Sequence, residues 1–358
     1  MLHNQKFNVG FVMPQRLITW VNYWLGTVLV EYNFRFKRNA IRERLKKLRR
    51  IPRCLHIEGT NICNAKCNFC AYPQMERAKQ VMPMPDFQEY IDQYISMGGK
   101  HISLTPIVGD PFVDRYLFDR LDYLYSLPQI ESFYFFTNAI LMTPEVSEKL
   151  LTYGDKLSVH VSWGGFDRDT YKTNMGVDRF DLVCQNIKTF IDKKRIANSS
   201  IGFYIGVRCP LSNCKGALWE EFRTYERDGL LGIHFTDGGY DSWAGKIKPE
   251  DLEKIGLVPL DMPYKRGACE FLFTKPVILA NGKVNACASR DVEAELIVGD
   301  LKESNLSEVW TGQGIEEIIE RQERGDFPDV CKRCTCYISV YNSLKSRTYK
   351  SALNWNDD

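Results

Sequence analysis

The residues best suited to chemistry are three cysteines with the spacing C-x3-C-x2-C, namely Cys63, Cys67 and Cys70. Thiolates are the preferred ligands of iron–sulfur clusters, and three of them on one loop can hold three corners of a cubane cluster. Three ligands leave one iron of the cubane open to bind a substrate. A zinc site is the competing interpretation, but it needs a fourth Cys or His. The nearest, His56 and Cys54, lie inside the preceding β-rich run.

A second group of cysteines lies near the C-terminus, with the pattern C-x12-G-x4-C followed by C-x2-C-x-C. Its members are Cys269, Cys287, Cys331, Cys334 and Cys336. A hairpin between the first two thiols would bring them together, and the turn 331–334 would supply two more. Four thiolates close a cluster fully. A zinc ribbon also uses two pairs of cysteines, and ligand number alone does not separate zinc from iron–sulfur.

The chain has 12 cysteines, and its first ten residues lack the basic and apolar pattern of a secretory signal. Clustered cysteines in such a chain indicate metal ligands in a reducing cytoplasm rather than disulfides. We expect Cys54 and Cys184 to be small core residues, and Cys209 and Cys214 to be structural or incidental. The net charge of +2 gives no reason to expect a nucleic acid partner.

Strand-like runs alternate with helical patterns after residue 53. The runs span 54–58, 101–106, 132–136, 157–163, 201–208 and 232–236, and the helical patterns lie near 86–97, 114–126, 143–153, 180–193 and 217–228. This alternation predicts an α/β fold with parallel strands, either a partial (βα)6 TIM-like barrel or a flavodoxin-like doubly wound sheet. In both topologies, functional groups lie at the carboxyl ends of the strands.

The alternation ends at a linker around residues 244–263. Two apolar runs, 275–279 and 283–287, then flank Asn281-Gly282, which is the strongest short hairpin signal. A helical pattern follows over residues 306–324. We therefore predict a helical segment over 1–52, the barrel over 53–243, and a linker with a small C-terminal hairpin and helix iron–sulfur domain over 244–358.

The N-terminal segment is apolar and then basic. Residues 17–30 are apolar but interrupted, and they fall short of a membrane span. The basic residues that follow are Arg35, Lys37, Arg38, Arg42, Arg44, Lys46, Lys47, Arg49 and Arg50. Residues 17–50 could contact an anionic membrane or a partner protein. We favour the alternative, in which the apolar helix packs on the core and the basic face is solvated.

The first cysteine motif resembles the signature of the radical S-adenosylmethionine (SAM) enzymes, with Phe69 as the usual aromatic residue before Cys70. The resemblance covers about residues 54–236. It implies a partial (βα)6 barrel in which the open iron of a [4Fe-4S] cluster binds SAM. It further implies reductive cleavage of SAM to a 5′-deoxyadenosyl radical, which takes a hydrogen atom from the substrate, with a reductant such as flavodoxin or ferredoxin.

The same resemblance suggests SAM-binding residues at successive strand ends. Gly109 and Asp110 are similar to part of a Gly-Gly-Glu-Pro turn, with Val108 in place of the first glycine. Asn138 belongs to a segment similar to Thr-Asn-Gly, with Ala139 for the glycine. Ser162 and Arg208 are further candidates, since a guanidinium pairs well with the SAM carboxylate. Candidate acids or bases at strand ends are Asp110, Asp237, Tyr240 and Asp241.

The second cysteine group is similar to the SPASM/twitch extension of the same superfamily, in its shorter form with one auxiliary [4Fe-4S] cluster. This resemblance implies Cys269, Cys287, Cys331 and Cys334 as ligands, with Cys336 as an alternate. It favours a small polar biosynthetic intermediate as the substrate, to be oxidised or rearranged. Residues 1–52 show no strand-rich unit for binding a leader peptide. A peptide-modifying maturase and a non-enzymatic zinc or iron–sulfur protein are the alternatives.

Overall fold

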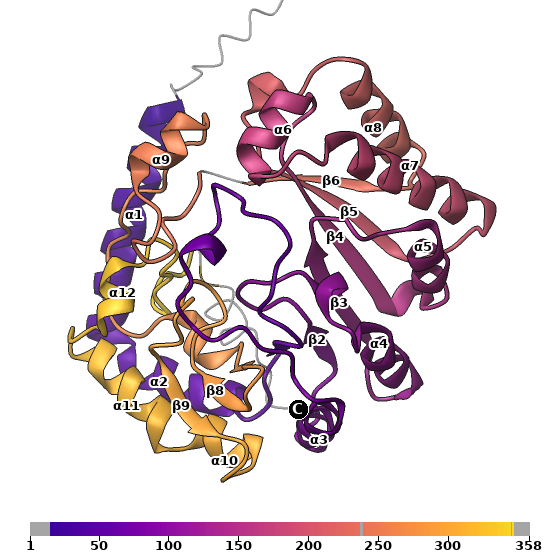
Figure 1. The fold of residues 1–358 in the computed structure, drawn as a ribbon. Coiled ribbons are helices and arrows are strands. Elements are labelled where there is room, and N and C mark those ends of the chain that lie inside the picture. Colours follow the sequence, from indigo (N-terminus) through magenta and orange to yellow (C-terminus); the bar gives the residue numbers. More distant parts are fainter. Residues whose placement is uncertain (1–14, 237–238, 345, 347–358) are drawn as a thin grey trace, which may run out of the picture.

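The computed structural model describes residues 15–236, 239–344 and 346. Six strands follow one another in the chain and pair side by side in the same order, all parallel (Figure 1). They are β1 (Leu55–Ile57), β2 (His101–Ser103), β3 (Ser132–Thr137), β4 (Leu157–Trp163), β5 (Gly202–Val207) and β6 (Gly232–Phe235). A doubly wound sheet would reverse its strand order at a switch point. The unbroken order confirms the partial barrel.

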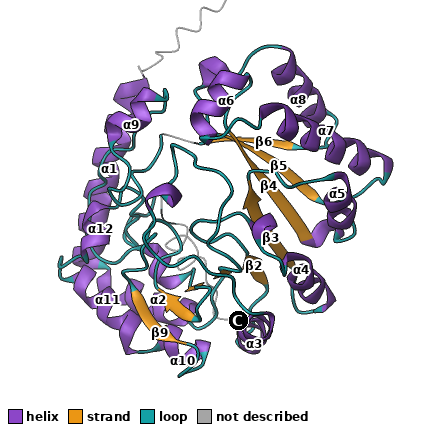
Figure 2. Ribbon diagram, viewed as in Figure 1, coloured by secondary structure: helices purple, strands orange, loops and turns teal. Residues whose placement is uncertain are grey.

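Helices cover the outside of these strands (Figures 1 and 2). They are α3 (Met84–Ser96), α4 (Leu117–Ser126), α5 (Pro144–Leu151), α6 (Arg168–Met175), α7 (Phe180–Ile196) and α8 (Ala217–Arg227). Strand β4 shows why helices cover one side of the sheet. Its residues are alternately buried and half-buried, so its two faces differ. Val159 and Val161 join Ile187 and Phe190 of α7 in the core between sheet and helices. The intervening side chains, such as His160, face the barrel interior.

The C-terminal segment extends the same sheet. Strand β7 (Val277–Ile278) pairs in parallel with β1, and β8 (Lys283–Asn285) and β9 (Ile297–Asp300) add antiparallel strands. The predicted hairpin is thus present. The expected single helix over 306–324 is wrong, since it divides at Gly312 into α10 (Leu306–Thr311) and α11 (Gln313–Glu323). A Cβ at Gly312 would lie 2.4 Å from the Glu308 carbonyl oxygen.

Two N-terminal helices pack against the C-terminal segment (Figure 1). They are α1 (Gln15–Phe36) and α2 (Arg38–Arg49). Val30, Ile41 and Leu45 share an apolar core with Trp310 and Ile319, so this part of the predicted packing on the core is present. No helix among the described residues has the length and apolar character needed to cross a membrane.

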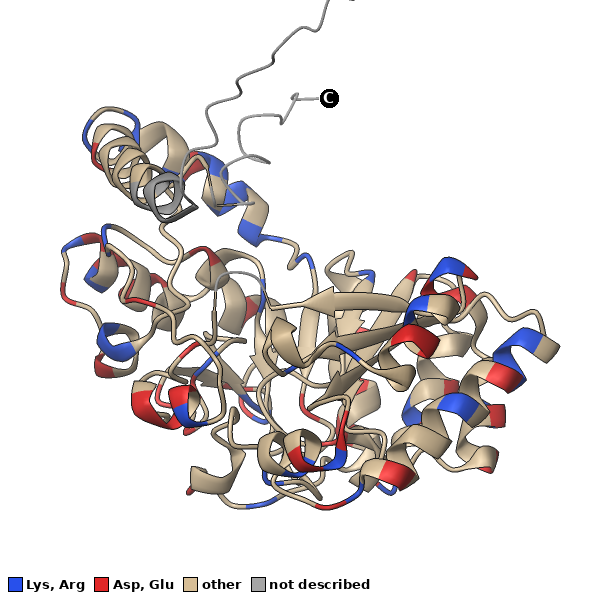
Figure 3. Cartoon of the chain, turned by 90° about the horizontal axis from the view of Figure 1, so that it is seen from above, with Lys and Arg blue, Asp and Glu red and all other residues tan. Residues whose placement is uncertain are grey.

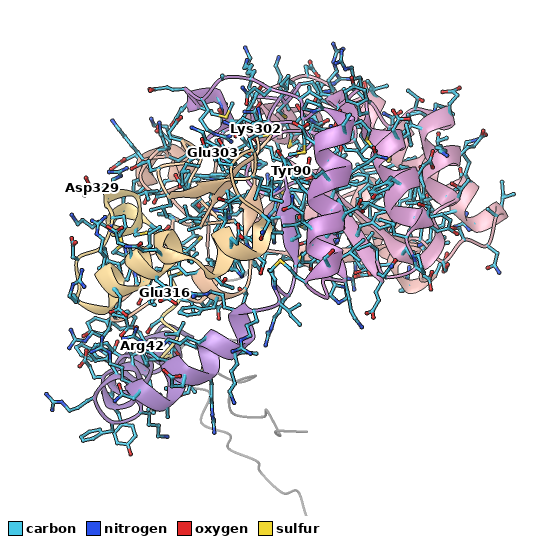
Figure 4. The ribbon with its side chains drawn as sticks, turned by 90° about the horizontal axis from the view of Figure 1, so that it is seen from below. Arg42, Tyr90, Lys302, Glu303, Glu316 and Asp329 are labelled. Carbon is cyan, nitrogen blue, oxygen red and sulfur yellow. The ribbon has the colours of Figure 1, made fainter. Side chains whose placement is uncertain are left out.

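We expected the basic face of α2 to be solvated, but three of its arginines are paired with acids. Arg38, Arg42 and Arg49 pair with three glutamates of α11, namely Glu323, Glu320 and Glu316. Figure 4 shows Arg42 beside the helix that carries Glu316. Arg49 is only 4% exposed, and Glu323 is 1% exposed at its side chain. These ion pairs attach the N-terminal helices to the domain that carries the second cysteine group.

Candidate iron–sulfur and SAM site

The first three thiols lie on the loop that follows β1, at the carboxyl edge of the parallel strands. The loop is held by α6, because the amide of Asn68 donates to the Asn174 carbonyl at 3.0 Å and its side-chain amide donates to the Thr173 carbonyl at 2.7 Å. At the other end, the Trp243 indole donates to the Phe69 carbonyl at 2.9 Å. The loop therefore has a fixed position between the barrel and the C-terminal segment.

Burial and mutual proximity raise the pKa values of the thiols on this loop. Desolvation raises the pKa of Cys67, and the nearby Cys70 and Cys63 raise it further. Burial likewise raises the pKa of Cys70 to about 11, with smaller effects from Arg290, Asp241 and Arg208. Three half-buried, desolvated thiolates so close together are stable only when a cation binds them. The donor set thus fits a thiolate-ligated metal cluster, and the ligand assignment remains a prediction.

The turn after β2 braces this loop. Gly109 has a φ of +111°, and a Cβ there would lie 2.6 Å from the Thr60 carbonyl oxygen. The buried carboxylate of Asp110 accepts hydrogen bonds from the Thr137 hydroxyl at 2.9 Å and the Asn138 amide at 2.7 Å. It also accepts from the Phe112 amide. Burial raises the pKa of Asp110 despite these donors. Asp110 thus joins the ends of β2 and β3.

Three other predicted SAM-binding residues lie at the same edge. The Asn138 side-chain amide donates to Asn64 at 2.6 Å and lies 3.8 Å from the Cys63 sulfur. Ser162 is half-buried at the end of β4. The guanidinium of Arg208 donates to the Thr236 hydroxyl at 2.8 Å, and its charge lowers the pKa of Cys70. The structure brings these side chains to one edge, and their contacts with SAM remain predictions.

The second cysteine group lines a cavity in the C-terminal segment, with an empty volume of about 440 Å³ that includes space open to solvent. The four predicted ligands, Cys269, Cys287, Cys331 and Cys334, all line it, whereas Cys336 does not. Within the described residues, no group of three or more His, Cys, Asp or Glu side chains is already arranged to hold a metal ion. The four thiols instead lie on the walls of the cavity.

Hydrogen-bond donors point at these sulfurs. The Gln322 side-chain amide donates to the Cys331 sulfur at 3.3 Å, and its carbonyl accepts from the Cys269 amide at 2.7 Å. The amide of Cys336 donates to the Cys334 sulfur at 3.3 Å. Donors of this kind stabilise the negative charge of cluster sulfurs. No sequence pattern pointed to Gln322, which lies in the last turn of α11.

Arg290 lies between the two cysteine groups and was also missed from the sequence. It lines the cavity of the second group, and its charge acts on Cys70 of the first. Its side chain is 29% exposed, pairs with Asp241 at 2.5 Å and lies over the Trp243 ring at 4.4 Å. The candidate acid Asp241 is therefore paired with a cation. Asp237, another candidate acid, lies outside the described residues.

Comparison with protein families identifies the chain. Residues 57–208 match the model of the Radical SAM superfamily, and residues 269–335 match SPASM, an iron–sulfur cluster-binding domain. The chain belongs to the radical SAM superfamily. Members bind SAM at a [4Fe-4S] cluster, and the SPASM domain adds auxiliary cluster binding. The second family match of this radical SAM protein begins at Cys269 and contains Cys287, Cys331 and Cys334.

Curated relatives match only part of this radical SAM protein. The GTP 3′,8-cyclase of Clostridium perfringens is 24% identical over 141 residues, which is 38% of this chain and 42% of the relative. A probable GTP 3′,8-cyclase of Saccharolobus solfataricus is 30% identical over 141 residues, 38% of this chain and 43% of the relative. The match thus spans less than half the length of these relatives.

Solved structures share the fold over most of the chain. SuiB of Streptococcus suis, bound to its precursor peptide SuiA, has a TM-score of 0.57 and 17% identity, covering 87% of this chain and 77% of that one. BtrN in complex with AdoMet and 2-DOIA has a TM-score of 0.51 and 16% identity. The match covers 78% of this chain and 92% of BtrN. At these identities the likeness establishes the fold alone.

Proposed function

We propose that this radical SAM protein cleaves SAM reductively and abstracts a hydrogen atom from a small polar biosynthetic intermediate. One electron from a protein reductant such as flavodoxin or ferredoxin, delivered through a [4Fe-4S] cluster on Cys63, Cys67 and Cys70, would break the S–C5′ bond of SAM to give methionine and a 5′-deoxyadenosyl radical. The radical then takes a substrate hydrogen and becomes 5′-deoxyadenosine. The surrounding residues, including Asn138 and Arg208, would orient SAM.

One observation carries this proposal, the three half-buried thiols on one loop at the carboxyl edge of the barrel. The two residues that could have completed a zinc site are placed elsewhere. Cys54 precedes β1, whereas the three thiols follow it. His56 lies within β1 and is 6% exposed, with no hydrogen-bond partner at either ring nitrogen. This placement supports an open iron at the cluster.

A small-molecule substrate is supported by the extent of the structural match to BtrN. BtrN is matched over 92% of its length, and its structure contains 2-DOIA together with AdoMet. A peptide substrate is the second candidate, because the SuiB complex with its precursor peptide covers 87% of this chain. Net oxidation, with a second electron passing to the auxiliary cluster, is our preferred outcome. We further infer a surface contact through residues 17–50, argued below.

Anaerobic reconstitution tests the proposed cleavage. Dithionite-reduced protein should convert SAM to 5′-deoxyadenosine, measured by liquid chromatography. Cys67→Ala should abolish this product while the auxiliary cluster keeps about four irons. Cys184→Ala is the matched control, because Cys184 is a half-buried thiol on α7 outside both groups. Iron-loaded protein that leaves SAM intact would support a non-enzymatic iron–sulfur protein instead, and a colourless zinc-loaded protein would support a zinc protein.

A further inference from the structure

Helix α1 is apolar on two opposite faces. Its buried face carries Val30 and Asn33, both 2% exposed, and the Asn33 side-chain amide donates to the Tyr341 carbonyl at 2.9 Å. The opposite face carries six large apolar side chains that we call the α1 apolar stripe. They are Val21 (41% exposed), Trp24 (50%), Leu25 (47%), Val28 (61%), Tyr32 (51%) and Phe36 (68%).

The stripe is continuous along the helix. Val21, Leu25, Val28, Tyr32 and Phe36 recur at intervals of three and four residues, which places them on one side of α1. A helix that is apolar all round is normally covered on every side. Contiguous exposed apolar side chains of this kind mark an interaction surface. The C-terminal segment covers one side of α1, so the stripe needs a second occupant.

Exposed cations continue from the end of the stripe. Over residues 35–50 the exposed charged side chains are six cations and one carboxylate, namely Arg35, Lys37, Arg44, Lys46, Lys47, Arg50 and Glu43. Figure 3 shows basic residues along the N-terminal helices. The Lys37 ammonium lies 5.7 Å from the ring centre of Tyr32, directly at the stripe. The chain as a whole carries only +2, so this excess is local.

We propose that α1 and α2 dock on an anionic phospholipid surface. Aromatic and aliphatic side chains beside Lys and Arg are typical of helices that lie in the membrane interface. Phosphate headgroups match the local cation excess. A second copy of the chain would bring an equally basic surface against it, which is unfavourable. The acids of α11 engage Arg38, Arg42 and Arg49, whereas the six cations named above stay exposed to solvent.

Vesicle flotation of the reconstituted full chain tests this docking. The chain should float with vesicles of equal parts phosphatidylcholine and phosphatidylglycerol, far less with phosphatidylcholine alone, and less at high salt. The double variant Leu25→Glu, Val28→Glu should lose flotation. The double variant Arg35→Gln, Lys37→Gln should weaken binding roughly fivefold per cation.

Matched controls lie on the barrel. Ile196→Glu changes an apolar residue that is 85% exposed, and Lys172→Gln changes a lysine that is 61% exposed. Both should float as the unchanged chain does. Absence of flotation with either vesicle type would overturn the proposal, as would flotation that persists in both double variants. A dimer that dissociates in Leu25→Glu, Val28→Glu without any vesicle binding would assign the stripe to a second copy. Circular dichroism checks that each variant is folded.

Discussion

At the scale of single residues, Arg290 is the charge shared by both cysteine groups. Burial acts to lower its pKa, but Asp241 and the nearby thiols of Cys336 and Cys334 outweigh this effect and raise it. The guanidinium therefore keeps its charge in a site of low polarity, where electrostatic interactions are strong. A fixed cation favours the reduced, more negative state of a neighbouring cluster.

Arg290→Gln should therefore lower the midpoint potential of the auxiliary cluster, and Asp241→Asn should raise it. These opposite directions follow from removing a cation in one variant and an anion in the other, and a purely structural defect would not produce them. Redox titration followed by electron paramagnetic resonance measures both shifts. Arg321→Gln and Asp326→Asn change a surface pair of the same domain and should leave the potential unchanged. Shifts in the same direction would contradict the electrostatic role.

The fifth thiol of the second group gives another residue-scale prediction. Cys336 does not line the cavity that Cys334 lines, so Cys336→Ala should retain the iron of the auxiliary cluster. Cys334→Ala should lose most of it, about four irons per chain if the cluster is lost. Iron and sulfide analysis after reconstitution decides between the two thiols. Equal loss in both variants would mean that Cys336 also supports the cluster.

The sequence allowed the thiols to be proposed, but not the residues around them. Cys63, Cys67 and Cys70 are near one another because short stretches of chain join them, so their spacing is informative on its own. Gln322 and Cys269 are 53 positions apart and are joined only by the packing of α11 on the rest of the C-terminal segment, and Arg290 and Asp241 meet across the linker. Such contacts leave no local pattern in the sequence.

At the scale of elements, α2 and α11 are joined by ion pairs of unequal burial. Glu323 is almost fully buried and accepts hydrogen bonds from Arg38 and from the Tyr341 hydroxyl at 2.9 Å. It also accepts from the Ala268 amide. Glu320 is 38% exposed at its side chain. Breaking a buried pair leaves a charge without compensation, whereas a solvated pair contributes little.

Glu323→Gln should therefore lower the free energy of unfolding by about 2 kcal/mol, because the donors Arg38, Tyr341 and Ala268 lose a buried charged acceptor. Glu320→Gln should cost no more than about 1 kcal/mol. Urea unfolding followed by circular dichroism measures both. Limited proteolysis then shows whether α1 and α2 detach first, as cleavage within residues 15–49 before the barrel is cut. Equal effects of the two substitutions would contradict the role of burial.

The elements themselves were largely predictable from the sequence. Alternation in β4 and the Asn281-Gly282 turn are local signals, and both elements formed where expected. Helix α6 was missed, although Asp167 caps it by accepting from the Thr170 amide at 2.8 Å. Its eight residues are mostly polar, so it lacks the apolar periodicity that marks a helix. The division at Gly312 depends on contact with β9, where a Cβ at Gly314 would lie 2.7 Å from the Val298 carbonyl oxygen.

At the scale of the whole molecule, the barrel interior contains imidazole rings. The His160 ring stacks on Tyr204 with centres 4.7 Å apart, and Tyr204 lies 5.1 Å from His234. Burial, followed by His234 and Arg208, lowers the pKa of His160 to about 4. Burial and Lys275 lower the pKa of His56 to about 3. The folded barrel therefore keeps both rings neutral at a pH where the unfolded chain would protonate them.

This difference predicts a loss of stability in mild acid. Below the ordinary histidine pKa of 6.5 the unfolded chain takes up protons that the fold excludes, so stability falls as the pH drops from 6.5 and the effect levels off near 4 for His160 and near 3 for His56. Each ring contributes up to about 1.4 kcal/mol per pH unit. His56→Met should flatten the dependence between pH 7 and 5, measured by urea unfolding, whereas His101→Gln, at an exposed histidine, should not. An unchanged slope in His56→Met would mean that the interior of the barrel admits the proton.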